Sequence, residues 1–291
     1  MIGKSRHLAA LATGEGASRE QFGQGCGVLQ HSPPPGSYRH TRHLPGPELA
    51  AWVQHFWIET WNWHGAAPQR REVLPLPSVH LAFIPGRSRI FGVQLGRFAR
   101  ELTGNGCVVG VKLRPGAFYP FLRRPVSGIA NTSLPLGDVF VGSLEAEREI
   151  FAHHEEAAMV KTAAGFLTAR LPPEDPNVEL ACGIVEAIAA DKSITRVDQV
   201  VSRWRINERS LQRLFRRHVG ASARWVIKRY RIYEALQRLS SEMKPEWADL
   251  AQEIGYFDQA HFINDFRKLV GCSPAQYSLS PPSECGQQQP G

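Results

Sequence analysis

The 291-residue sequence has no apolar run near the ~20 residues that a helix needs to cross a bilayer, and residues 1–14 lack the apolar core of a secretory signal peptide. It also lacks any C-x-x-C pair. An odd number of cysteines without metal-ligand spacing is typical of reduced thiols in a cytosolic protein. These absences predict a soluble, cytoplasmic protein with no membrane partner. The five cysteines are Cys26, Cys107, Cys182, Cys272 and Cys285.

Signatures of catalytic sites are missing as well. His40 and His43 would share one face of a helix, but no carboxylate or cysteine follows them at metal-site spacing. Ser78 and His80 occupy alternating strand positions, without the Gly-x-Ser-x-Gly turn of a serine nucleophile. We therefore expect a protein that is not an enzyme and that needs no metal or other cofactor.

What the sequence does contain is an internal repeat. Residues 207–222 (NERSLQRLFRRHVGAS) return 51 positions later as residues 258–273 (DQAHFINDFRKLVGCS). Each copy starts with a residue that can cap a helix, Asn207 or Asp258, and ends in Val-Gly-x-Ser, whose glycine suits a helix C-terminus. The repeat therefore predicts two copies of one small helical unit.

A partner helix is expected just upstream of each copy. Thr195 and Asp198 fit the capping box of the first partner helix, and apolar residues follow at helical spacing. The matching run upstream of the second copy is offset by 50 residues rather than 51, which predicts one extra residue within the turn 255–257. A helix, a tight turn and a second amphipathic helix make a helix-turn-helix unit.

The two copies differ in charge. Residues 203–231 hold ten Lys or Arg and a single acid, Glu208, whereas residues 245–278 hold two basic and five acidic residues. An ordinary helical repeat mixes charges on its solvated face. Charge of one sign opposite the packing face is expected of a protein that binds DNA phosphates and base edges. We therefore predict a DNA-binding protein whose first unit supplies most of the affinity.

Residues 178–278 resemble the DNA-binding domain of the AraC/XylS family of transcription regulators. The likeness is sharpest at residues 254–262 (IGYFDQAHF), and Asn207 stands where the family more often has Ser, which capping tolerates. Further matching positions are Phe266, Gly271, Ser273, Pro274 and Tyr277.

The resemblance implies a seven-helix domain. One long helix, about residues 223–240, would join two helix-turn-helix units, each placing a recognition helix in the major groove of double-stranded DNA. The resemblance also implies transcription regulation, more commonly activation, with RNA polymerase as a further partner.

Family positions also indicate which side chains contact DNA. Arg can form paired hydrogen bonds with guanine and Gln with adenine, each giving about 1–3 kcal/mol of discrimination. For His261, a structural or phosphate-binding role is as well supported as a base contact. The candidate DNA-binding residues are Arg209, Gln212, Arg213 and Arg216 in the first unit, and Gln259, His261, Asn264 and Lys268 in the second.

The N-terminal part is predicted to be β-rich. Short apolar or alternating runs occupy residues 79–84, 89–95 and 107–113, and a helix is expected over residues 47–60. Segments 74–81, 91–93 and 110–118 resemble an uncharacterised β-rich domain commonly attached to AraC-type regulators. By analogy with the wider family, this domain would sense a small-molecule effector or form a homodimer.

The predicted fold class is therefore α+β, with a β-rich N-terminal domain followed by an all-α C-terminal domain that contains two helix-turn-helix units. The expected segments are a poorly ordered N-terminal stretch (1–36), a β-rich sensor domain (37–142), a helical connector and linker (143–176), the DNA-binding domain (177–280) and a disordered tail (281–291).

The N-terminal domain offers few ligand-binding candidates. Four tryptophans between residues 52 and 63 either wall an apolar pocket or fill a core. His80 has the better case for a structural role, and Arg114 is a candidate anion site. The alternative function is a DNA-targeted enzyme such as a methyl-accepting DNA-repair regulator, with Cys26 or Cys107 as acceptor. The zinc-bound cysteine cluster of those proteins is absent from this sequence.

Overall fold

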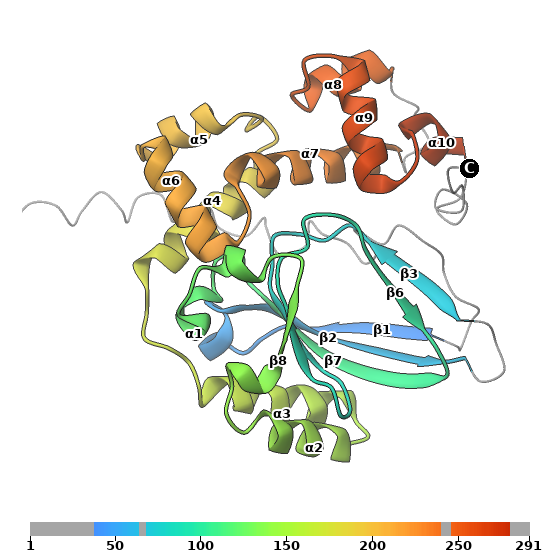
Figure 1. The fold of residues 1–291 in the computed structure, drawn as a ribbon, viewed down its shortest axis with the longest axis vertical. Helices are drawn as coiled ribbons and strands as arrows, with labels where there is room; N and C mark the ends of the chain where they lie inside the picture. The colour runs from blue at the N-terminus through green and yellow to red at the C-terminus, as the bar shows by residue number, and fades with distance from the viewer. Residues whose placement is uncertain (1–37, 64–67, 240–245, 280–291) are drawn as a thin grey trace, which may run out of the picture.

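The computed structural model describes residues 38–63, 68–239 and 246–279. The expected poorly ordered stretch 1–36 and the expected tail 281–291 lie outside these residues. Within them, a β-rich N-terminal part precedes an all-helical C-terminal part, which confirms the α+β prediction. The helical part lies along one side of the β-rich part (Figure 1).

Six antiparallel strands form the main sheet of the N-terminal part, and two more form a separate ribbon. The sheet order is β1 (Tyr38–His43), β2 (Val53–Asn62), β7 (Asn105–Leu113), β4 (His80–Phe83), β5 (Arg89–Phe91) and β8 (Ser133–Pro135). The ribbon pairs β3 (Gln69–Val73) with β6 (Phe98–Leu102). The runs predicted around residues 79–84 and 107–113 are thus confirmed as strands, and the run 89–95 is a strand only over its first three residues.

The helix expected over residues 47–60 is wrong. Only Pro47–Leu49 is helical, as a short 3₁₀ turn called η2, and strand β2 begins at Val53. Phe56 and Ile58 enter the core while the intervening Trp57 stays partly exposed. This period of two, with β-branched and aromatic residues, is typical of a strand packed on one face.

Two helices pack against the N-terminal sheet on the side away from the C-terminal part (Figure 1). They are α2 (Ser143–Ala152) and α3 (Glu156–Thr168). Phe166 of α3 meets Phe83 edge-on at 5.7 Å. Glu147 of α2 accepts hydrogen bonds of 2.6 Å from the Gly86 amide and the Ser88 hydroxyl. Short helices α1 (Tyr119–Leu122), η3 (Val126–Ile129) and η4 (Leu136–Asp138) complete this part.

The C-terminal part has the expected seven α-helices within the described residues. They are α4 (Pro176–Ala190), α5 (Val197–Trp204), α6 (Glu208–Leu214), α7 (Ala223–Leu239), α8 (Trp247–Glu253), α9 (Gln259–Val270) and α10 (Pro274–Leu279), with a π-helical turn η5 (Phe215–Val219) after α6. Helix α7 runs between the α4–α6 group and the α8–α10 group (Figure 1), as the long joining helix was predicted to do.

The two helix-turn-helix units pack into different hydrophobic clusters. The first unit shares one continuous core with the N-terminal sheet, whereas α8 and α9 pack with the C-terminal half of α7 and with Leu74. Helix α7 is therefore buried on more than one face. Arg229, Arg231 and Glu234 are buried along it together with its apolar residues.

No helix in the described parts of the chain is long and apolar enough to cross a membrane. Cys107 and Cys182 are free thiols, whereas Cys272 is disulfide-bonded, so the expectation of reduced cysteines is wrong at Cys272. An odd cysteine count leaves at least one thiol unpaired but does not prevent the others from pairing.

Candidate nucleic-acid interface

The first unit is built from α5, a three-residue turn and α6. Arg205 takes a left-handed conformation (φ 49°) that ends α5, and Asn207 Oδ1 accepts a hydrogen bond of 2.8 Å from the Ser210 amide to begin α6. The predicted capping box at Thr195 and Asp198 is wrong. Helix α5 begins after Arg196, and the Gln199 side chain accepts from the backbone amides of Thr195 and Arg196 at 2.9 and 2.8 Å.

The second unit repeats this geometry with one residue more. Asp258 Oδ1 caps α9 by accepting from the His261 amide at 2.7 Å, 51 positions after Asn207. The turn amides of Ile206 and Tyr256, 50 positions apart, each bond to the carbonyl five residues before, at 3.2 and 2.9 Å. The extra residue is therefore Phe257, and its side chain is 97% exposed.

The recognition helix of the first unit changes its winding after Leu214. Residues 215–219 form a π-helical turn, in which the Gly220 amide bonds to the Phe215 carbonyl at 2.8 Å and Gly220 takes φ 85°. His218 is thereby buried, and Arg216 lies on the π turn rather than on α6. The predicted positive φ is confirmed at Gly220 and also at Gly271 (φ 100°).

All eight candidate DNA-binding side chains are exposed. On α6, Leu211 and Leu214 are buried beneath Arg209, Gln212 and Arg213. Their polar contacts are local: Gln212 bonds to Glu208 at 3.1 Å, and Arg213 to the Ser210 hydroxyl at 3.5 Å. Because these contacts are exposed, they can be exchanged for contacts with a ligand at little cost. Gln259, Asn264 and Lys268 are exposed in the same way along α9.

His261 differs from the other candidates because its ring is already engaged. It packs edge-on against Tyr256 at 5.2 Å, and its Nε2 lies 3.5 Å from Asp265 Oδ2. Asp265 also pairs with Lys228 of α7 at 2.5 Å. These contacts favour the structural role for His261.

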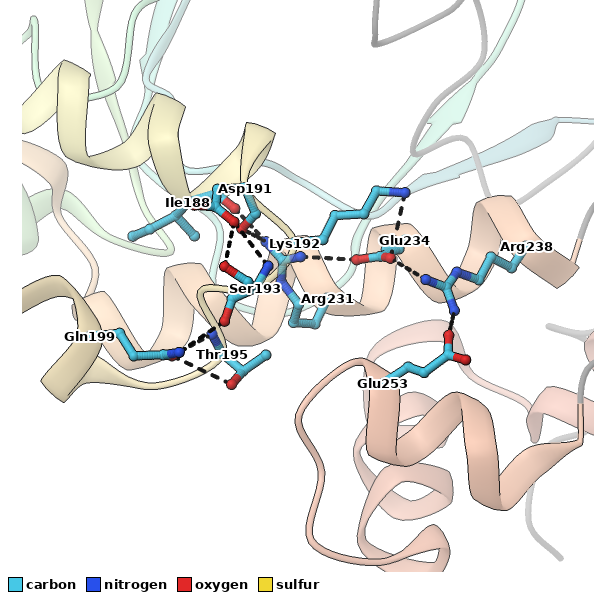
Figure 2. A network of polar contacts seen from close by, with 10 residues as sticks. All are labelled: Ile188, Asp191, Lys192, Ser193, Thr195, Gln199, Arg231, Glu234, Arg238 and Glu253. Atoms are coloured by element: carbon cyan, nitrogen blue, oxygen red, sulfur yellow. Dashed lines mark hydrogen bonds and ion pairs between the residues drawn. The ribbon is translucent and has the colours of Figure 1, made fainter. Parts of the chain in front are cut away.

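A chain of polar contacts joins α4, α7 and α8 (Figure 2). Arg231 donates to Glu234 at 2.9 Å and to the Ile188 carbonyl at the end of α4. Glu234 also accepts from Arg238 at 2.6 Å, and Arg238 pairs with Glu253 of α8. The buried Arg231–Glu234 pair holds α7 against the end of α4, whereas the Arg238–Glu253 link to α8 is more exposed and contributes less.

The charge of the sequence segment does not show which basic residues are paired within the protein, and it therefore overstates the charge that faces DNA. Among the basic residues of 203–231, Arg229 and Arg231 are only 0% and 2% exposed. Arg203 pairs with Asp191 at 2.6 Å, and Lys228 is the partner of Asp265. The number of exposed cations on the two recognition helices therefore describes the charge available to DNA better than the net charge of the segment does.

The N-terminal part contacts both units. On the first, Arg217 of η5 bonds to the Tyr119 hydroxyl, and its guanidinium lies 4.3 Å from that ring's centre. On α7, the Tyr233 hydroxyl donates to the Leu74 carbonyl. Close to the second unit, a Cβ on Gly271 would lie 2.1 Å from Arg97 Nη1.

Among the ligand-binding candidates of the N-terminal part, Trp52 and Trp63 are buried. Trp57 and Trp61 are half-buried and lie flat over Gly110 and Gly106, where any Cβ would strike their rings. Arg114, the candidate anion site, pairs with Glu186 of α4 at 2.6 Å. This pair is a contact between the two parts of the chain rather than an open site.

Comparison with known proteins agrees with this geometry. Residues 200–279 match a family model described as a helix-turn-helix domain, and residues 41–135 match a domain of unknown function (DUF6597). The arabinose operon regulatory proteins of Escherichia coli K12 and Salmonella typhimurium LT2 are each 29% identical over 106 residues, which is 36% of this chain and 36% and 37% of the relatives. The chain thus matches about a third of each relative's length.

Two solved structures resemble this chain at lower sequence identity. An apo variant of ToxT from Vibrio cholerae has a TM-score of 0.42 and 11% identity, covering 77% of this chain and 97% of that one. The xylose-binding transcription activator XylR has a TM-score of 0.31 and 23% identity, covering 38% of this chain and 28% of that one. The C-terminal part is an AraC-type helix-turn-helix domain, the fold of AraC-family DNA-binding transcription regulators.

Proposed function

We propose that the protein is a sequence-specific transcription regulator that binds double-stranded DNA through α6 and η5 of the first unit and α9 of the second. The observation that carries this proposal is the repeated unit geometry at the two ends of α7. With 17 residues, α7 is about 25 Å long, so units at its ends can occupy successive major grooves, about 34 Å apart.

The proposed base-reading residues in the first unit are Arg209, Gln212 and Arg213, with Arg216 beside them. In the second unit they are Gln259 and Asn264, with Lys268 close to the backbone and His261 as a support for the start of α9. The first unit presents more exposed arginines, which supports our proposal that it supplies most of the affinity.

The contacts of the N-terminal part support a sensing role as part of this proposal. It packs on the first unit through Tyr119 and on α7 through Leu74, so a ligand that changed its shape would act on both units. We propose that an effector or a second copy of the chain acts through these contacts, and that the regulated step is recruitment of RNA polymerase, most often as activation.

A methyl-accepting enzyme is the weaker candidate. Methyl transfer needs a thiolate, and burial raises the pKa of Cys182 to about 12. Burial also raises the pKa of Cys107, with the Glu156 carboxylate adding to the shift. Cys26 lies outside the described residues. A methyl-transfer assay on the purified protein tests this candidate directly, because stoichiometric methylation would require an enzymatic function.

The proposed function is tested by selecting DNA with the full chain. A library of random duplexes is enriched for binding, and the preferred duplex is footprinted. We expect protection of two major-groove segments on one face, one helical turn apart. Genome-wide mapping of the bound sites in the source organism then identifies the regulated genes. Enrichment of no sequence, or protection of a single groove, would contradict the proposal.

A further inference from the structure

A cleft of about 340 Å³ lies between the two helix-turn-helix units, and His261 is the one candidate DNA-binding residue in its lining. Its walls come from the start of α5, the N-terminal half of α7, and the turn and first residues of the second unit. Gly255, at φ 84°, lies against Thr195, so the two units touch on one side of it.

The charged groups that line this cleft are all basic. They are Arg196, Arg224, Lys228 and Arg231, together with His261, and the lining contains no carboxylate. Three of the cations have carboxylate partners just beyond the lining: Asp198, Asp265 and Glu234. Within the described residues, Arg224 has no ion pair, and its side chain is exposed.

A large apolar ring lies at the edge of the cleft. Phe257, the extra residue of the second turn, has 97% of its side chain exposed. Covering an exposed aromatic ring with a partner is favourable, so this edge of the cleft suits a bound molecule with an apolar surface.

The cleft faces away from the N-terminal part. At 100° per residue, Arg224, Lys228 and Arg231 lie on one face of α7, and Trp225, Arg229 and Tyr233 on a face about 140° away. The second set contacts the N-terminal part through Leu95 and Leu74. The cleft is therefore open to an external partner while the N-terminal part is docked.

We propose that this cleft binds the sugar–phosphate backbone of the DNA that runs between the two major grooves. Arg224 binds a phosphate, and Phe257 packs against the neighbouring deoxyribose. A cation beside an exposed apolar ring matches the alternation of phosphate and sugar along a strand. The assignment rests on the proposed function, because it needs both units on one duplex.

The test uses the full chain and the preferred duplex from the selection described above. Single methylphosphonates, which remove one phosphate charge, are placed at each position between the two protected grooves. We expect one or two central positions to weaken wild-type binding about tenfold and to have no further effect on Arg224→Ala. Arg224→Ala should also lower the slope of log affinity against log salt by about 0.9, equivalent to one phosphate.

Two variants complete the test. Arg148→Ala removes another exposed arginine, from α2 on the far side of the N-terminal sheet, and should leave the salt slope unchanged. Phe257→Ser should weaken binding to every duplex by a similar factor without changing the slope, and Phe257→Leu should restore most of the loss.

The outcomes separate this inference from the proposed function. If no central methylphosphonate weakens wild-type binding, the proposed backbone site is wrong. Protection of two grooves would in that case still support the proposed function as a transcription regulator. An Arg224→Ala slope equal to that of Arg148→Ala also overturns the backbone site, as expected if the cleft instead holds a small anion. If no duplex is selected, the proposed function fails, and this inference fails with it.

Discussion

Arg229 Nη2 donates a hydrogen bond of 2.7 Å to the backbone carbonyl of Leu95, which also accepts from the Trp225 indole at 3.1 Å. This carbonyl thus accepts two hydrogen bonds from α7, in addition to the bond that Tyr233 donates to Leu74. Arg229 is 0% exposed, and its Nε and Nη1 have no partner among the described residues. Burial lowers the pKa of Arg229 to about 10, which still leaves it charged at neutral pH. The contact therefore contains a charge that is only partly compensated.

This partial compensation predicts opposite effects for two buried arginines on the same helix. Arg229→Met should leave stability unchanged or raise it by about 1–2 kcal/mol, because it removes an uncompensated charge and keeps the packing on Trp225. Arg231→Met should lower it by about 2–4 kcal/mol, because Glu234 loses a partner in a buried position. Urea unfolding of both variants measures the difference. Equal destabilisation would show that Arg229 is fully compensated.

The contact between the two units predicts a specific intolerance at Gly255. An alanine there would have the strain of a positive φ, and its Cβ would lie 2.3 Å from the Thr195 Cβ. Gly86 also has a positive φ (74°), but nothing lies within 4 Å of the place that an added Cβ would take. Gly86→Ala should therefore cost about 1 kcal/mol, and Gly255→Ala at least 1–2 kcal/mol more. Equal losses in thermal unfolding would show that Thr195 moves aside freely.

The sequence predicted the parts of the fold that depend on local chemistry. The two caps, Asn207 and Asp258, and the extra residue in the second turn follow from side-chain type and spacing. The role of α7 was predicted only in part. Its joining position was expected, but Arg229 and Arg231, which are buried on nearly opposite sides of the helix, have no hydrophobic signature. Contacts between segments more than a hundred residues apart cannot be predicted from periodicity.

Sequence reasoning also failed where a segment has two competing patterns. Residues 47–60 begin with Pro-Glu-Leu, which suits a helix start, but Phe56 and Ile58 alternate with polar or half-buried residues and pair with β7. Tertiary pairing decided the outcome. In the candidate site, exposure of the base-reading residues agrees with the sequence, whereas the roles of Arg231 and Lys228 depend on carboxylates from other elements.

Two histidines of the N-terminal sheet predict a pH dependence of stability. His55 and His80 each pair in register with Lys112 on β7. Burial, with a smaller effect of the Lys112 charge, lowers the pKa of His55 to about 2 and of His80 to about 3. Their ordinary value is about 6.5, so below this pH the unfolded chain binds protons that the folded chain does not.

The free energy of unfolding should therefore be insensitive to these histidines above pH 6.5 and should fall as the pH drops toward 4. The upper limit is about 1.4 kcal/mol per pH unit for each histidine, less where solvent reaches the ring. His80→Gln should reduce this slope relative to wild type, even if it changes the stability at pH 7.5. Urea titrations between pH 7.5 and 5 measure the slope of the free energy of unfolding against pH. Identical slopes for wild type and His80→Gln would show that His80 binds protons equally in the folded and unfolded chain.

The unequal charge of the two units predicts unequal roles in DNA binding. On α6, Arg213 is exposed and makes a 3.5 Å contact with Ser210, which is its single hydrogen bond within the described residues, so it can form paired hydrogen bonds with a guanine. Arg213→Ala should weaken binding to the preferred duplex by about 1–3 kcal/mol. It should not weaken binding to a duplex in which the base pair with that guanine is replaced. Asn264→Ala should cost less, because the second unit adds little phosphate attraction. Fluorescence anisotropy at fixed salt compares the two, with Arg148→Ala as the control for loss of one charge. If Asn264→Ala abolished binding while Arg213→Ala kept it, the second unit would be the dominant reader.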